Sequence, residues 1–338
     1  MLSNLSQIKT PKDFVSIEEI RQQALTALAK RFGQTRAENY CGSNVGSITG
    51  SSFLRNRAAL DELRLRTRVI HRINAVDTSL EVLGVSAETP VFAAPIAGSS
   101  VDYQEVIKGC QGQQTLCFIG YPQPHDNIKE FAQIPEKKIA WIIKPLRDLE
   151  EFKTCFKIAE EAGCFAVGID VDSAAGLQQY THSSTWRLDW SFRAMEELQT
   201  IREWTILPFI IKGILSVEDA ELCVAAGVDA LIVSNHAGHA LDCTQSAVDV
   251  LPEIADTVGR KVDVLMDGGI RHGTDILKAL ALGAKGVLVG RPTIWGYNAG
   301  GAAGVAKLFE LLTQELTRAM QLTGVSDVKD VPNSILAS

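Results

Sequence analysis

The sequence predicts an α/β fold, a parallel (β/α)8 TIM barrel with a short N-terminal helical extension. Beyond about residue 90, eight short apolar runs alternate with amphipathic helices, and this alternation is typical of a parallel sheet. Eight such units are the number that closes a barrel. The runs are continuously apolar, as strands covered on both faces should be. We place the strands at residues 91–94, 116–119, 139–143, 166–171, 208–212, 230–234, 262–266 and 286–289.

An internal repeat supports the barrel. Six residues between Gly213 and Val233 recur 56 residues later, between Gly269 and Val289. This offset spans two βα units, so the two segments are expected to be equivalent quarters of a barrel. A glycine at a helix end, such as Gly227, takes positive φ without steric cost and turns the chain into the next strand.

The first 75 residues look different from the rest. Ser16 and Glu19 form a capping-box pattern, and Gly33 can end the helix that follows. Residues 40–52 are rich in glycine and serine, which predicts a flexible loop. That loop is either a surface linker or a mobile segment over an active site. We therefore divide the chain into an N-terminal helical segment with this loop, residues 1–75, and a barrel, residues 76–338.

Composition narrows the class of protein. The formal net charge is −7, whereas a nucleic-acid binder would normally carry a basic surplus. We find neither an apolar stretch long enough for a membrane span nor a secretion signal after Met1. The seven cysteines are odd in number and contain no Cys-x-x-Cys pair, which favours reduced thiols over disulfides or a metal site. We expect a cytoplasmic homo-oligomer with a small-molecule substrate and no nucleic-acid, membrane or metal partner.

Two glycine-rich turns indicate a phosphate site. Gly268, Gly269 and Arg271 follow the seventh predicted strand, and Gly290 and Arg291 follow the eighth. Backbone N–H groups, a helix N-terminus and guanidinium groups together bind a dianion, and this architecture often binds phosphate at that place. The alternative is a pair of turns with two surface arginines.

A polar cluster is expected beside that site. His236 ends the sixth strand, and Asp172 at the end of the fourth could orient its ring as a base. Lys212 ends the fifth strand in an apolar run, and a buried lysine needs an electron-rich partner. The alternatives are a structural role for His236 and an ion pair of Lys212 with Asp170 or Asp172.

These motifs resemble the FMN-dependent α-hydroxy acid oxidase and dehydrogenase family, whose members act on glycolate, lactate and mandelate. The resemblance covers roughly residues 53–322. It is most specific in Ser-Asn-His-Ala-Gly-His-Ala-Leu-Asp (234–242), Asp-Gly-Gly-Ile-Arg-His-Gly-Thr-Asp (267–275) and Gly-Arg-Pro (290–292). Shorter matches lie at residues 56–59, 76–79, 94–97 and 212–213.

The resemblance implies an FMN-dependent oxidoreductase that converts a hydroxyl group to a keto group. His236 would be the base, Asp172 would hold its imidazole, and electrons would pass to N5 of FMN. Lys212 would face the N1–C2 edge of the flavin, where a cation stabilises the reduced form. The residues assigned to FMN are Pro95, Ile96, Ala97, Lys212, Ser234, Asp267, Gly268, Gly269, Arg271, Gly290 and Arg291.

The sequence departs from the family where a substrate carboxylate would bind. His239 replaces an arginine, residues 175–179 replace a second arginine, and Lys144 replaces the tyrosine of a Gln-x-Tyr pattern. A histidine lacks the bidentate fork of arginine, and its charge depends on pH. We expect His239, Lys144, Gln178 and Tyr40 to contact the substrate. Lactate and glycolate should then react slowly, and better at low pH if protonated His239 is their anchor.

Two alternatives keep the cofactor without this reaction. One is a non-catalytic FMN-binding scaffold, which the lost arginine favours. The other is flavin-dependent chemistry of the isomerase kind. His236 beside Asp172 favours the oxidoreductase, since a scaffold does not need an activated base.

Overall fold

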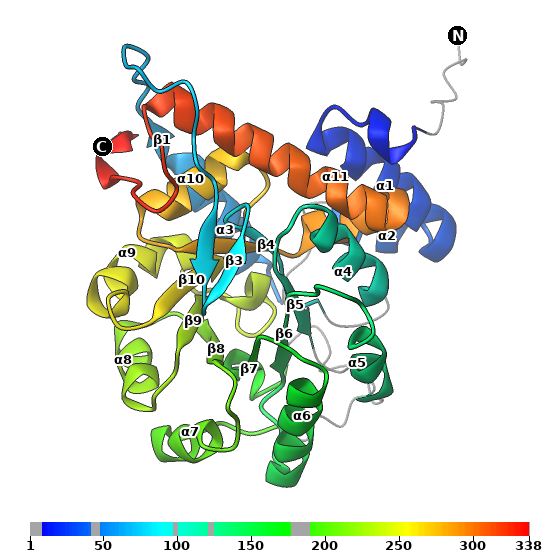
Figure 1. Ribbon diagram of the computed structural model, residues 1–338, viewed down its shortest axis with the longest axis vertical. Helices are drawn as coiled ribbons and strands as arrows, with labels where there is room; N and C mark the ends of the chain where they lie inside the picture. Colours follow the sequence, from blue (N-terminus) through cyan, green and yellow to red (C-terminus); the bar gives the residue numbers. More distant parts are fainter. Residues whose placement is uncertain (1–8, 42–47, 97–100, 121–124, 177–189, 338) are drawn as a thin grey trace.

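The computed structural model describes residues 9–41, 48–96, 101–120, 125–176 and 190–337. Eight parallel strands close into a barrel in the order β10-β11-β4-β5-β6-β7-β8-β9 (Figure 1), which confirms the predicted fold. The strands are β4 (Val91–Ala93), β5 (Cys117–Gly120), β6 (Ile139–Ile143), β7 (Ala166–Asp170), β8 (Phe209–Ile214), β9 (Ala230–Val233), β10 (Asp263–Asp267) and β11 (Gly286–Val289).

The strands lie within two residues of their predicted limits, because full burial on both faces gave each of them an apolar run. The largest difference is at β8, which continues to Ile214. Its pairing with β9 shifts register between Lys212 and Ile214, and Gly213 has a φ of 101° there. A Cβ at Gly213 would lie 2.6 Å from Cβ of Asp172, so only glycine lets the fourth and fifth strand ends come this close.

Helices cover the outside of the barrel (Figure 1). Several begin at a side chain that accepts a hydrogen bond from the first turn, as Asp102, Asp148, Ser216 and Ser246 do. The helices of the barrel are α4 (Tyr103–Gly112), α5 (His125–Phe131), α6 (Leu149–Glu161), α7 (Met195–Arg202), α8 (Val217–Ala225), α9 (Ala247–Val258), α10 (Gly273–Ala281) and α11 (Arg291–Thr323).

The 56-residue repeat corresponds to β8–α8 and β10–α10. Gly213, one residue before the end of β8, and Gly269, two residues after β10, have φ values of 101° and 79°, and Gly227 and Gly283 have 80° and 98° after the helices. The repeated glycines therefore have a positive φ in both quarters, which agrees with the predicted equivalence of the two segments.

The N-terminal segment packs on the barrel. Helix α1 (Ile17–Phe32) is capped by Ser16, whose Oγ accepts a hydrogen bond from the N–H of Glu19, and it ends at Gly33 with φ of 86°. The carboxylate of Glu19 accepts from the N–H of Val15, so the capping box is only half formed. Figure 1 shows α1 lying along α11. Residues of α1 join the same hydrophobic core as the barrel strands, and the boundary near residue 75 stays a prediction.

The predicted flexible loop over residues 40–52 is wrong at both ends. Tyr40 and Cys41 end α2 (Gln34–Cys41), and Ser51 begins α3 (Ser51–Glu62). The carboxylate of Asp242 accepts hydrogen bonds from the N–H groups of residues 49, 50 and 52 and from two hydroxyl groups. This remote anchor fixes the start of α3 where composition alone indicates a loop. Residues 42–47 lie outside the described ranges.

Two small sheets complete the chain. The hairpin of β2 (Leu80–Val82) and β3 (Val85–Ala87) precedes β4, and β1 (Arg64–Leu65) pairs with β12 (Leu336–Ala337). Within the described ranges, no helix combines the length and the apolar composition that crossing a membrane requires.

Candidate active site

His236 occupies a strained turn immediately after β9. Its φ is 53° and that of Ala237 is 54°, in the left-handed region that costs a residue with a side chain roughly 1–2 kcal/mol. The N–H of His236 donates to Oγ of the buried Ser234 at 3.0 Å, which holds the turn. Strained backbone of this kind clusters at functional sites. The turn points the imidazole toward the ends of the neighbouring strands.

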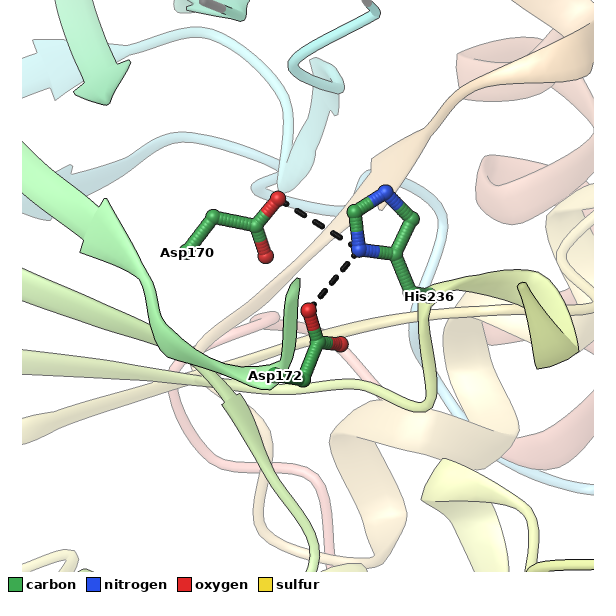
Figure 2. Close-up of side chains that lie close together, drawn as sticks. All are labelled: Asp170, Asp172 and His236. Carbon is green, nitrogen blue, oxygen red and sulfur yellow. Dashed lines mark hydrogen bonds and ion pairs between the residues drawn. The ribbon is translucent and has the colours of Figure 1, made fainter. Parts of the chain in front are cut away.

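Two carboxylates meet one nitrogen of His236. Its Nδ1 lies 2.9 Å from Oδ1 of Asp172 and 3.4 Å from Oδ2 of Asp170. Figure 2 shows both acids on the Nδ1 side of the ring, while Nε2 points away from them. Two acceptors fix the proton on Nδ1, so Nε2 is the nitrogen that can accept a proton. The expected contact with Asp172 is present.

Asp170 is the residue that sequence reasoning did not place beside His236. Its Oδ1 accepts from Nζ of Lys212 at 3.1 Å, and its Oδ2 accepts from Nζ of Lys144. Both lysines are buried, and the ion pair of Lys212 with Asp170 was one of the two interpretations of that residue. A signal existed: Asp170 and Asp172 are two residues apart at a strand end, and that spacing places side chains on one face.

The electrostatics separate the two acids. Burial alone would raise the pKa of Asp170, but His236 and the two lysines hold that pKa well below its usual range. Burial and the charge of Asp170 raise the pKa of Asp172. Burial would lower the pKa of His236, but Asp170 in particular raises it above its ordinary value. Of the two acids, Asp170 is therefore the one that stays deprotonated to the lower pH.

The same three groups could be considered as metal ligands. Ligand atoms of Asp170, Asp172 and His236 lie within 4.8 Å of one another. The ammonium groups of Lys144 and Lys212, however, already supply positive charge to Asp170. A divalent cation would meet their repulsion, so hydrogen bonding accounts for the cluster better than metal binding does.

Two partly buried arginines lie where the sequence predicts an anion site. The guanidinium of Arg291 lies 4.1 Å from the ring centroid of Phe53, and that of Arg271 lies 5.2 Å from the centroid of Trp295. Arg271 donates to the carbonyl oxygen of Ile270, and neither guanidinium has a carboxylate partner within the described ranges. Burial lowers the pKa of Arg291 to about 9 and that of Arg271 to about 10. Two desolvated cations without an anion fit a phosphate dianion.

Helix α3 fixes the glycine turn beside these arginines. Arg57 donates to both carboxylate oxygens of Asp275, at 2.6 and 2.8 Å, and to the carbonyl of Gly269 at 2.9 Å. The N–H of Arg271 donates to the same carboxylate. A Cβ at Gly269 would lie 2.3 Å from the carbonyl oxygen of Asn56, so the turn needs glycine. The resemblance included residues 56–59 without assigning them this role.

Tyr103 positions the segment after β4. Its hydroxyl accepts from the N–H groups of Ile96, at 2.6 Å, and Gly120, at 3.0 Å, and donates to the carbonyl of Ile96. Burial raises the pKa of Tyr103, so the hydroxyl keeps its proton. No sequence pattern indicated this residue, because its partners are backbone groups of other segments.

We expect Tyr103→Phe to lower the free energy of unfolding by roughly 2 kcal/mol, because three backbone groups, one buried and two partly buried, lose their partner. Chemical denaturation of the FMN-loaded protein measures the loss. Tyr297→Phe on α11 is the matched control, since no hydrogen bond of its hydroxyl is found within the described ranges. Equal stability of the two variants would contradict the role of Tyr103.

The other predicted cofactor residues gather at the same end of the barrel. Asp267 ends β10 with an oxygen 3.8 Å from Nζ of Lys212, and Gly290 precedes α11. Pro95 lies next to Ile96, and Gly268 has a φ of 100° beside Asn56. Ala97 and Gln178 lie outside the described ranges. Tyr40 is half-buried, and its backbone carbonyl accepts from Nε1 of Trp295, whose ring lies beside Arg271.

His239 lies beside the base. Its ring centroid is 6.3 Å from that of His236, and its buried Nδ1 has no hydrogen-bond partner within the described ranges. Burial, followed by repulsion from His236 and Arg291, lowers the pKa of His239 to about 3. The residue is therefore neutral at ordinary pH. The expectation that protonated His239 anchors a carboxylate at mildly acidic pH is corrected accordingly.

Comparison with known proteins agrees with this geometry. A family profile described as FMN-dependent dehydrogenase matches residues 29–194 and 177–338. The chain belongs to this family. A 2-hydroxyacid oxidase of Dictyostelium discoideum is 31% identical over 96% of the chain and 90% of the relative. An L-lactate oxidase of Nostoc sp. is 30% identical, over 91% and 95%. A crystal structure of mandelate oxidase superposes with a TM-score of 0.83 at 29% identity, over 96% and 98%.

Membership makes the chain an FMN-dependent oxidoreductase, and the anion site described above fits the phosphate of FMN. We expect Arg291→Ala to weaken FMN binding by about 10- to 150-fold, since a hydrogen bond to a charged group contributes about 1.5–3 kcal/mol. Titration of the cofactor-free protein with FMN, followed by flavin fluorescence, measures this. Arg318→Ala, at an exposed position on the same helix, is the control and should bind like the parent.

Proposed function

We propose that this FMN-dependent oxidoreductase oxidises the hydroxyl group of a 2-hydroxy acid-like substrate to a keto group. One observation carries the proposal: Nδ1 of His236 is engaged by two carboxylates, so Nε2 is left to accept a substrate proton. The named relatives, which act on hydroxy acids, support the substrate class.

The chain contributes five functions in this mechanism. Nε2 of His236 accepts a proton from the substrate, and Asp172 with Asp170 stabilises the resulting imidazolium. Arg271 and Arg291 would hold the phosphate of FMN, and Tyr103 keeps the segment at Ile96 in place. When bound, FMN would supply the acceptor for the two electrons that the alcohol loses. Lys212 supplies a positive charge at the same barrel end, consistent with its implied place beside the flavin.

The residues proposed to contact substrate differ in their support. His239 lies beside the base, with its ring centroid 6.3 Å from that of His236, and this proximity supports a contact with the substrate. Lys144 already forms an ion pair with Asp170. Gln178 stays a proposal from the sequence, and Tyr40 stays one near the phosphate end.

Cytoplasmic location and homo-oligomer assembly also remain proposals. All seven cysteines are free thiols, and six of them are buried, which suits a reducing compartment.

Anaerobic mixing with a panel of 2-hydroxy acids tests the reaction. Loss of flavin absorbance together with formation of the keto acid supports the proposal. A flavin that stays oxidised, and therefore yellow, with every member of the panel would contradict the proposal and favour the non-catalytic scaffold.

A further inference from the structure

One oxygen of Asp170 is shared between a cation and the base. Oδ2 accepts from Nζ of Lys144 and also lies 3.4 Å from Nδ1 of His236. The other oxygen, Oδ1, accepts from Lys212 at 3.1 Å. The three side chains of this acid and the two lysines are 3–6% exposed, so water does little to screen their charges.

We propose that Asp170 is a second positioning residue for His236, and that Lys144 sets how strongly Asp170 acts on the imidazole. Lys144 then serves as the counter-charge of Asp170, in place of the substrate contact that the sequence indicates. The inference rests on the proposed function only for its kinetic consequence, because the protonation of His236 is measurable without turnover.

The charged surroundings of His236 fix the direction of each effect. Asp170 faces it from the end of β7, and Asp172 faces it from the turn that follows (Val171–Ser173). Lys144 faces it from after β6, Lys212 from β8, and His239 from the same turn as His236 itself. Asp267 of β10 reaches the cluster through Lys212. The two carboxylates favour the imidazolium and the two lysines disfavour it. His239 is neutral and contributes little charge.

Opposite substitutions should therefore move His236 in opposite directions. Asp170→Asn keeps the shape of the side chain and removes its charge, so the pKa of His236 should fall by about one unit. Lys144→Met removes the cation that shares Oδ2, so the same carboxylate acts on the imidazole without competition and the pKa should rise. A merely structural role for the pair predicts no such opposition.

The experiment follows the ring of His236 in the FMN-loaded protein. The chain has six histidines, so isotope labelling of histidine gives a small set of ring signals, and the spectrum of His236→Asn assigns the one of interest. Its titration midpoint is recorded between about pH 5 and 10. In parallel, the pH dependence of flavin reduction by L-lactate is measured, and its acid limb should move with the midpoint, since neutral His236 is the base.

Asp263→Asn is the matched control. Asp263 forms an ion pair with Lys285 at 2.7 Å, at the start of β10 and so at the far end of the barrel from the site. Its removal should leave the midpoint of His236 unchanged.

Specific results would overturn the inference. One is a titration midpoint of His236 that moves in the same direction in Asp170→Asn and Lys144→Met. The other is a midpoint that stays within about 0.2 pH units of the parent value in either variant. If Asp170→Asn does not fold, Lys144→Met decides alone: a rise supports the inference, and a fall or no change overturns it. Opposite midpoint shifts in a protein whose flavin no member of the 2-hydroxy acid panel reduces would uphold the inference while contradicting the proposed function.

Discussion

Replacing His236 by alanine is expected to leave FMN bound and to slow substrate-driven reduction of the flavin by about 10²–10⁴-fold. The reason is that Nε2 of His236 points away from Asp170 and Asp172 and is the proposed proton acceptor (Figure 2). The contacts of Arg271 and Arg291 do not involve this side chain, so the anion site should survive. Stopped-flow absorbance of the bound flavin under anaerobic conditions measures the rate, and gel filtration before mixing verifies that FMN is retained.

A second substitution separates loss of the base from relief of backbone strain. His236 has a φ of 53°, and asparagine adopts the left-handed region more readily than alanine does. His236→Asn should therefore keep the turn and be as slow as His236→Ala. If either variant reduces its flavin at the parent rate, His236 is not the base.

The fold was largely predictable because its signals are local. Each barrel strand is buried on both faces and so appears as an apolar run, and the glycines of the 56-residue repeat mark equivalent turns. Helix α3 was not predictable from the composition of residues 48–52. Its start depends on hydrogen bonds to Asp242, about 190 positions away, and such a contact leaves no local pattern.

The site was predictable as a set of strand ends and not as a network. His236, Asp172 and the two arginines follow strands whose ends converge in any parallel barrel, so their proximity follows from the fold. The hydroxyl of Tyr103 acts on backbone groups, which no spacing encodes. The protonation state of His239 could not be predicted from the sequence either. Burial and neighbouring cations determine it, and both depend on the assembled structure.

The neutrality of His239 leads to the second large expected effect. His239→Arg should raise the efficiency of flavin reduction by L-lactate by about 30- to 1000-fold, since a bidentate charged pair contributes roughly 2–4 kcal/mol. Lys144 and Lys212 both pair with Asp170, so a substrate carboxylate would have to compete with that acid for either lysine. An arginine at position 239 would supply a positive charge for the substrate carboxylate at every physiological pH. The prediction requires that Ala237 and Ala240, which carry only a methyl group each, leave room for the longer side chain.

The matching uncharged substrate makes this prediction specific. Lactamide has the shape of lactate without its charge, so His239→Arg should improve reduction by lactate and leave reduction by lactamide nearly unchanged. In the parent, the rate with lactate should fall as the pH is lowered through the pKa of His236, which lies above its ordinary value, because His236 gains a proton there while His239, with a pKa of about 3, stays neutral. His239→Gln, which keeps a neutral hydrogen-bonding side chain, should follow the parent at every pH. A parent that reacts quickly with lactate, and does so equally well as His239→Ala, would show that His239 does not contact the carboxylate and that this group is bound elsewhere in the site.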